Sequence, residues 1–211
     1  MRRLMAHRLF WPIVMLLVLL LINLIAFPGF FSVQVRDGHL FGSLIDILRN
    51  GSPTLMIAVG MTLVIATRGI DLSVGAICAI SGAVACSIIL GSSDPGSPGT
   101  VAVAVIVAIL ISLVLGLWNG FLVSILGIQP IIATLILMTA GRGVAMLITE
   151  GQILTVNSPP FKVLGSGFFG GLPVSVLIAA ALFLFALLIT RRTALGLMIE
   201  AVGINPEASR L

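Results

Sequence analysis

Few side chains in this sequence are of the types that carry out acid–base, nucleophilic or metal-dependent chemistry. The two histidines, His7 and His39, stand in separate polar segments, and neither a His-Glu-x-x-His nor a Gly-x-Ser-x-Gly motif is present. The only lysine, Lys162, has no glycine-rich phosphate loop beside it. We therefore expect no enzyme activity, no metal site and no cofactor, so ATP hydrolysis linked to this chain would need a separate subunit.

The polar groups of greatest interest lie within or beside apolar runs. Arg142 stands between two glycines in such a run, and a charge at mid-membrane costs about 2.5 to 3.5 kcal/mol on insertion scales. Arg142 therefore needs a hydrogen-bonding partner or a water-filled cavity, and Asn119, Gln129 and Thr134 are candidate partners. Two interpretations stay open: a structural arginine held by hydrogen bonds, or a group of polar residues along a solute path.

The composition of the chain predicts the structural elements that carry these polar residues. The chain is 59% hydrophobic and 9% charged, and a soluble domain of 211 residues could not cover that much apolar surface. A lipid core of roughly 30 Å needs about 20 apolar residues in a helix, and lipid offers the backbone no alternative partners. The sequence predicts an all-α, polytopic membrane protein with six spans, over residues 9–31, 53–66, 72–90, 100–126, 131–149 and 174–190.

The second span is short, with an apolar run of only fourteen residues, so it is either tilted into protein or a broken element. We expect the amphipathic stretch before it, residues 40–48, to lie along the membrane interface. With the N-terminus in the cytoplasm, seven of the eleven basic residues fall inside, as is typical of membrane proteins: Arg2, Arg3, Arg8, Arg68, Arg191, Arg192 and Arg210.

Small residues recur at every fourth position of the fourth span and form one stripe on a helix. Such stripes let a second helix approach the backbone closely. We expect helix packing along this stripe, with a pore lining as the alternative, over Ala104, Ala108, Ser112, Gly116, Gly120 and Ser124.

Three segments resemble one family in the same order along the chain. Residues 60–75 resemble a signature of the ribose-type monosaccharide permeases of ABC importers; they read Gly-Met-Thr-Leu-Val-Ile-Ala-Thr-Arg-Gly-Ile-Asp-Leu-Ser-Val-Gly. The structural residues of this signature are Gly69, Asp71, Ser73 and Gly75. Residues 133–143 and 200–208 are similar to the same family. Residues 118–120, 128–138 and 151–153 resemble its galactofuranose permeases most.

The resemblance implies that residues 1–211 form one transmembrane permease domain, the N-terminal part of a longer family domain. It further implies a monosaccharide as solute, with galactofuranose preferred, in the inner membrane. The implied partners are an ATP-binding ABC subunit, a second permease subunit in a homo- or heterodimer, a periplasmic sugar-binding protein and membrane lipid, with no nucleic acid. Family members usually have glycine where Arg68 stands, so the arginine either restricts the backbone or forms a charge pair with Asp71.

Residues 194–211 are expected to form a cytoplasmic coupling segment that docks on the ATPase. They follow the last span and two arginines, and an apolar stretch is then broken by small and turn-forming residues. The segment also resembles the coupling region of the family, at Glu200, Gly203, Asn205, Pro206 and Glu207. A helix lying on the membrane surface is the alternative.

Two functions of other classes remain open. An ion- or proton-coupled carrier would need a carboxylate in the membrane. Among the acidic residues, only Asp71 comes close to such a position. A truncated subunit without transport of its own is the other. We expect Asp71 to accept hydrogen bonds at the start of the third span, with Ser73 nearby.

Overall fold

The chain is built almost entirely from helices. The computed structural model describes residues 9–27, 29–36 and 38–205. Within these residues, five helices are long and apolar enough to cross a membrane, and α2, of 17 residues, is a shorter apolar helix. These elements confirm the predicted all-α polytopic class. In chain order the elements are α2 (Phe10–Ala26), β1 (Gln34–Arg36), β2 (His39–Phe41), α3 (Ser43–Ala66), α4 (Val74–Gly91), α5 (Pro98–Ser124), α6 (Pro130–Ile148), α7 (Pro159–Ser166), β3 (Phe168–Phe169), β4 (Leu172–Pro173), α8 (Val174–Arg192) and α9 (Ala194–Ile204).

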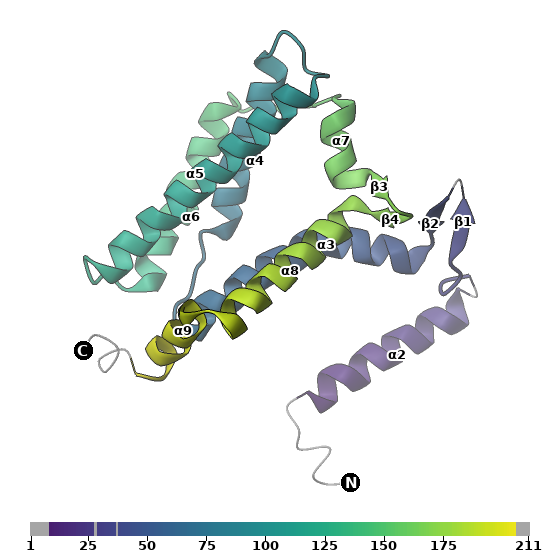
Figure 1. Ribbon diagram of the computed structural model, residues 1–211, viewed down its shortest axis with the longest axis horizontal. Coiled ribbons are helices and arrows are strands. Elements are labelled where there is room, and N and C mark those ends of the chain that lie inside the picture. Colours follow the sequence, from purple (N-terminus) through teal and green to yellow (C-terminus); the bar gives the residue numbers. More distant parts are fainter. Residues whose placement is uncertain (1–8, 28, 37, 206–211) are drawn as a thin grey trace.

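The long helices form two groups (Figure 1). In one group α4 packs against both α5 and α6, and in the other α3 packs along α8, with α9 across their ends. α4 and α6 approach each other closely at Gly141, where a Cβ atom would lie 2.9 Å from that of Ala76. A small apolar core joins α4 to α5 at the far end of the same group, with Ile89 and Ala104 fully buried.

The structure corrects the prediction for residues 40–66. Instead of an interfacial segment followed by a span of fourteen residues, α3 is one continuous helix of 24 residues with Pro53 inside it. Proline lacks an N–H group, but membrane helices tolerate it where side chains satisfy freed backbone groups. The hydroxyl of Ser52 donates to the carbonyl of Leu48 at 2.6 Å, one residue before the affected carbonyl. At about 1.5 Å per residue, α3 is about 36 Å long, enough to cross the membrane.

The first span is shorter than predicted. α2 ends at Ala26 and not at residue 31. The reason lies in the sequence, because proline at position 28 disfavours helical geometry in the preceding residue, Phe27, whose ψ is 87°. The other predicted spans agree with α4, α5, α6 and α8 to within two residues at each end.

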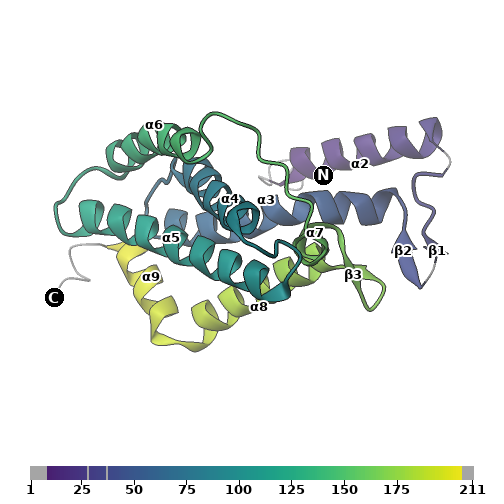
Figure 2. The same cartoon turned by 90° about the horizontal axis from the view of Figure 1, so that it is seen from above.

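Successive turns lie at opposite ends of the molecule (Figure 1). α3 and α8 run parallel, because β2 and β4 precede them at one end and α9 touches both of them at the other. The two hairpins meet where the Leu40 amide donates to the Gly171 carbonyl at 2.9 Å (Figure 2). The turn between α3 and α4 lies at the opposite end, together with the α5–α6 connection and α9.

Candidate functional site

Residues 67–73 form a turn, which we call the 67–73 turn, and hydrogen bonds to the last turn of α3 fix its first residues. The Gly69 amide donates to the Val64 carbonyl at 3.0 Å, and the Arg68 amide donates to the Ile65 carbonyl at 2.9 Å. These two bonds define a Schellman motif, in which the residue after the cap adopts a left-handed conformation and is usually glycine. Here that residue is Arg68, with φ of +61°. A left-handed conformation costs a non-glycine residue about 1 to 2 kcal/mol.

The start of α4 is fixed by the carboxylate of Asp71. Its Oδ1 atom accepts hydrogen bonds from the Ser73 amide at 2.7 Å and from the Ser73 hydroxyl at 2.6 Å. Ser73 is the N-cap residue of α4 and is fully buried. The predicted contact between Asp71 and Ser73 is therefore confirmed, whereas the alternative of an Arg68–Asp71 pair is not formed: the guanidinium of Arg68 instead donates to the carbonyl of Ile204.

α5 and α6 add two polar side chains to this turn. The side-chain amide of Asn119 donates to the Ser73 hydroxyl oxygen at 2.9 Å, deep in the protein. The Thr134 hydroxyl donates to the Pro130 carbonyl at 2.8 Å and lies 3.4 Å from the carbonyl oxygen of Ile70, which is a weak contact. Both side chains are buried, with exposed fractions of 6% and 3%.

These residues surround a cavity of about 220 Å³, which we call the turn cavity. It lies between the 67–73 turn, the second half of α5 and the start of α6. Its lining is Val64, Thr67, Gly69, Ile70, Asp71, Gly116, Asn119, Gly120, Val123, Pro130 and Thr134.

Asn119 lines the turn cavity, and one of its acceptor atoms lacks a partner. The Oδ1 atom of Asn119 is buried and has no hydrogen bond to any described residue. The amide cannot simply be turned around, because the Ser73 hydroxyl hydrogen already points to Asp71 and its oxygen must accept from the Asn119 nitrogen. A buried acceptor left unpaired costs about 1 to 3 kcal/mol, so this oxygen is suited to a donor such as a water molecule or a solute hydroxyl. Within the described residues no cluster of His, Cys, Asp or Glu could hold a metal ion.

The structure separates the predicted solute-path residues. Asn119 and Thr134 line the turn cavity, but Gln129 and Arg142 do not. Gln129 precedes α6 with an exposed side chain, and Arg142 lies eight positions beyond Thr134, about 12 Å along the helix. Arg142 is exposed on this chain, so the expected hydrogen bonds to Asn119, Gln129 or Thr134 are not formed within the described part of the molecule.

The signature residues also differ in what they do. Gly69 and Asp71 line the turn cavity and Ser73 lies behind it, but Gly75 is exposed and a Cβ atom there would meet nothing within 4 Å. Gly141 makes a close helix contact that the sequence reasoning did not assign. Small residues at 133, 141 and 145, all buried and all on one face of α6, were the available signal.

The predicted packing stripe on α5 is correct only in its first part. Ala104 is buried against α4, but a Cβ atom at Gly116 or Gly120 would meet nothing within 4 Å. The two glycines line the turn cavity, so their small size leaves open space rather than admitting another helix of this chain. Ser112 and Ser124 donate to carbonyls one turn earlier in α5 itself, at 2.9 and 2.6 Å.

The predicted coupling segment begins with α9, which rests on the ends of α3 and α8. A Cβ atom at Gly196 would overlap the Thr190 carbonyl, and one at Gly203 would overlap the Ala66 carbonyl. Gly203 was expected to break the helix, but it lies inside α9 and permits this close approach; the helix ends before Asn205. Glu200 is exposed on α9, while Pro206 and Glu207 lie outside the described residues.

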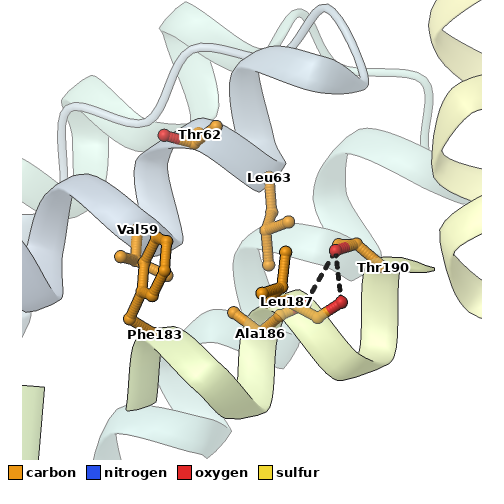
Figure 3. A pocket seen from close by; sticks show the side chains of 7 residues that line it. All are labelled: Val59, Thr62, Leu63, Phe183, Ala186, Leu187 and Thr190. Carbon is orange, nitrogen blue, oxygen red and sulfur yellow. Dashed lines mark hydrogen bonds between the residues drawn. The ribbon is translucent and has the colours of Figure 1, made fainter. Parts of the chain in front are cut away.

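A second hollow, of about 180 Å³, lies between α3 and α8 (Figure 3). Its lining is apolar apart from two threonines, and each of these hydroxyls is bonded within its own helix. Thr190 donates to the Ala186 carbonyl at 2.8 Å and Thr62 donates to the Ala58 carbonyl at 2.7 Å. The hollow therefore offers no free polar group to a hydrophilic solute, and the turn cavity is the better candidate site.

Comparison with known proteins gives a consistent result. The family model described as branched-chain amino acid transport system / permease component matches residues 43–211. The galactofuranose transporter permease protein YtfT of Escherichia coli strain K12 is 50% identical over 206 residues, which are 95% of this chain and 58% of that protein.

Two further relatives have names that refer to the import of other sugars. The fructose import permease protein FruF of Bifidobacterium longum is 41% identical over an alignment of 216 residues, and the ribose import permease protein RbsC of Escherichia coli strain K12 is 38% identical over 203 residues. These alignments take in 100% and 94% of this chain but only 59% of each relative. No solved structure matches the chain.

Proposed function

Because this chain belongs to the family of branched-chain amino acid transport system permease components, we propose that it is the membrane-spanning permease part of an ATP-driven sugar importer. The observation that supports this most is the turn cavity, where Asn119 presents an unpaired buried acceptor beside the carboxylate of Asp71. Hydroxyl groups of a sugar are donors of the kind that this acceptor lacks. Transport needs only weak hydrogen bonds along such a path, since the solute must leave again.

We propose galactofuranose as the preferred solute. The support is the 50% identity to a galactofuranose permease, against 41% and 38% for fructose and ribose permeases. The turn cavity does not favour one sugar over another, because its polar groups, a carboxylate, an amide and hydroxyls, accept or donate to any polyol.

The proposed assembly contains two permease subunits, two copies of an ATPase subunit and a periplasmic sugar-binding protein. The permease would lie in the inner membrane with its N-terminus in the cytoplasm, which places the 67–73 turn and α9 on the cytoplasmic side. Charge supports this orientation, because Arg68, Arg191 and Arg192 lie at that end, and basic residues favour cytoplasmic turns. Exposed apolar side chains over most of the long helices suit a lipid or protein surround.

Residues 194–211 are proposed to dock on the ATPase. α9 supports this role because it is fixed at both ends against the long helices, so a force applied to it would reach α3 and α8. The ATPase supplies the catalysis, and this chain supplies the path.

Uptake of labelled galactofuranose by cells that produce the full-length permease and its neighbours tests the proposal. Depletion of ATP should abolish uptake, and an uncoupler applied while ATP is maintained should not. Collapse of uptake with the uncoupler alone would identify an ion- or proton-coupled carrier, with Asp71 as the candidate carboxylate. Unchanged uptake after deletion of the gene would identify a subunit without transport of its own.

A further inference from the structure

Arg68 occupies a backbone position that suits glycine better. Its φ of +61° lies in the left-handed region, and the Schellman bonds of residues 68 and 69 fix that conformation. A strained residue of this kind persists only where its surroundings determine it, and it points to a role for the side chain.

The side chain of Arg68 reaches a helix far away in the sequence. Its guanidinium donates to the carbonyl of Ile204, the last residue of α9, at 3.0 Å. Next to this bond, Gly203 packs against the Ala66 carbonyl at the end of α3. The guanidinium of Arg68 therefore binds the carbonyl end of α9 close to where α9 meets the end of α3, and a cation is favourable at the C-terminus of a helix.

The same turn faces the turn cavity on its other side. Gly69, Ile70 and Asp71 follow Arg68 directly and line the cavity. Asp71 is held through Ser73 to Asn119 of α5. One short turn thus contacts α9 through Arg68 and the cavity through Asp71, so displacement of α9 would pull on the residues that line the cavity.

We propose that Arg68 is a positioning residue that fixes α9 to the 67–73 turn and so links the position of the proposed ATPase-docking segment to the turn cavity. This inference rests on the proposed function. The bond is exposed, so its loss weakens the link without abolishing transport.

The first test measures the position of α9 without depending on transport. Spin labels at Ile65 and Met198, both exposed, report the distance between α3 and α9 in the purified full-length permease lacking Cys78 and Cys86. Arg68→Ala and Arg68→Gly should broaden the distance distribution, and Arg68→Lys, which still donates, should stay narrower. Because glycine removes the backbone strain, Arg68→Gly keeps the turn folded while it deletes the bond. Distributions like that of the unsubstituted protein in both the alanine and glycine variants would overturn the proposal.

The second test measures coupling in the reconstituted transporter. Arg68→Ala and Arg68→Gly should lower sugar transported per ATP hydrolysed by about five-fold, the size expected from loss of one hydrogen bond. The matched control is Glu150→Gly, because Glu150 is the other left-handed non-glycine residue among those that the structure describes, with φ of +53° just after α6, and it does not line the turn cavity. This control should leave coupling and the α3–α9 distance unchanged. A fall of equal size in Glu150→Gly, or unchanged coupling in both Arg68 variants, would overturn the inference; absence of ATP-driven uptake in the unsubstituted protein would instead refute the proposed function.

Discussion

At the scale of single residues, Asp71 works through its acceptor geometry. Its Oδ1 atom accepts hydrogen bonds from the amide and the hydroxyl of Ser73, and the Ser73 hydroxyl oxygen in turn accepts one from the side-chain amide of Asn119. An asparagine side chain can accept the same two bonds with its own oxygen, whereas a leucine of similar size accepts none.

We therefore expect Asp71→Asn to retain most uptake and Asp71→Leu to lose it. The leucine variant leaves two buried donors on Ser73 unpaired, at a cost of about 1 to 3 kcal/mol for each. Uptake by the full-length protein at matched expression checks this. Complete loss in both variants would show that the negative charge itself is required.

A substitution at Asn119 should lower uptake without lowering the stability of the protein. In Asn119→Leu the bond to Ser73 is lost, but the unpaired buried oxygen is removed as well, so the two effects offset each other within about 1 kcal/mol. We expect thermal unfolding of the purified permease to change little while uptake falls several-fold, since the cavity loses its free acceptor. A large drop in unfolding temperature, with uptake per folded protein unchanged, would mean that Asn119 is only structural.

The contact between Asp71 and Ser73 could be predicted because the two residues are neighbours in sequence and helix starts have known capping chemistry. The contact from Asn119 could not, because it depends on how α5 packs on α4. The surroundings of Arg142 could not be predicted for the same reason: its position in an apolar run is a local fact, but the direction in which it points depends on how α4 packs on α6, which it contacts at the preceding residue, Gly141.

At the scale of elements, α9 depends on glycine at two crossing points. Gly203 crosses the Ala66 carbonyl, and the overlap predicted for a Cβ atom there involves backbone on both sides, so neither partner can turn away. Gly60, in α3, is the matched control, since a Cβ atom there would meet nothing within 4 Å.

Gly203→Ala should displace α9 and lower sugar-dependent ATP hydrolysis by the assembled transporter, whereas Gly60→Ala should leave it unchanged. In a helix interior, alanine is otherwise favoured over glycine by about 0.5 to 1 kcal/mol, so any loss in Gly203→Ala reports the clash. Normal hydrolysis in Gly203→Ala would show that α9 does not rest on α3 in the assembled protein.

Element boundaries show where sequence reasoning was limited. Helix starts and stops marked by Gly, Pro and charged residues were found to within two residues for α4, α5, α6 and α8. The boundary expected at Pro53 is not found, because α3 continues through the proline: in lipid, leaving the helical state would cost more than the one backbone hydrogen bond that proline removes.

At the scale of the whole molecule, the proposed topology of six crossings with both ends inside can be tested directly. Cysteines at Ser97 and Ser166, in a background without Cys78 and Cys86, should react with an impermeant thiol reagent added outside intact cells, because both residues lie at the end of the molecule opposite the 67–73 turn. A cysteine at Thr193 should react only after the membrane is opened. Reaction at Thr193 from outside would remove one crossing or reverse the orientation.

The fold class and the order of the helices could be predicted because the period and length of apolar runs are set by the lipid thickness alone. The grouping of α3 with α8, and the turn cavity between the 67–73 turn, α5 and α6, could not, because contacts between apolar helices leave little trace in composition. The glycine stripe on α5 illustrates the limit: the same residues suit close packing or an open cavity, and the position of the neighbouring helices decides between them.

The most direct measurement of the central claim is uptake by proteoliposomes that contain the full-length permease, its ATPase and its sugar-binding protein. We predict accumulation of labelled galactofuranose that requires ATP inside the vesicles and binding protein outside, and that excess unlabelled galactofuranose suppresses more than ribose or fructose does. Asn119→Leu should reduce the accumulation at equal protein content. Accumulation driven by an imposed ion gradient without ATP, or none under any condition with correctly assembled subunits, would contradict the account.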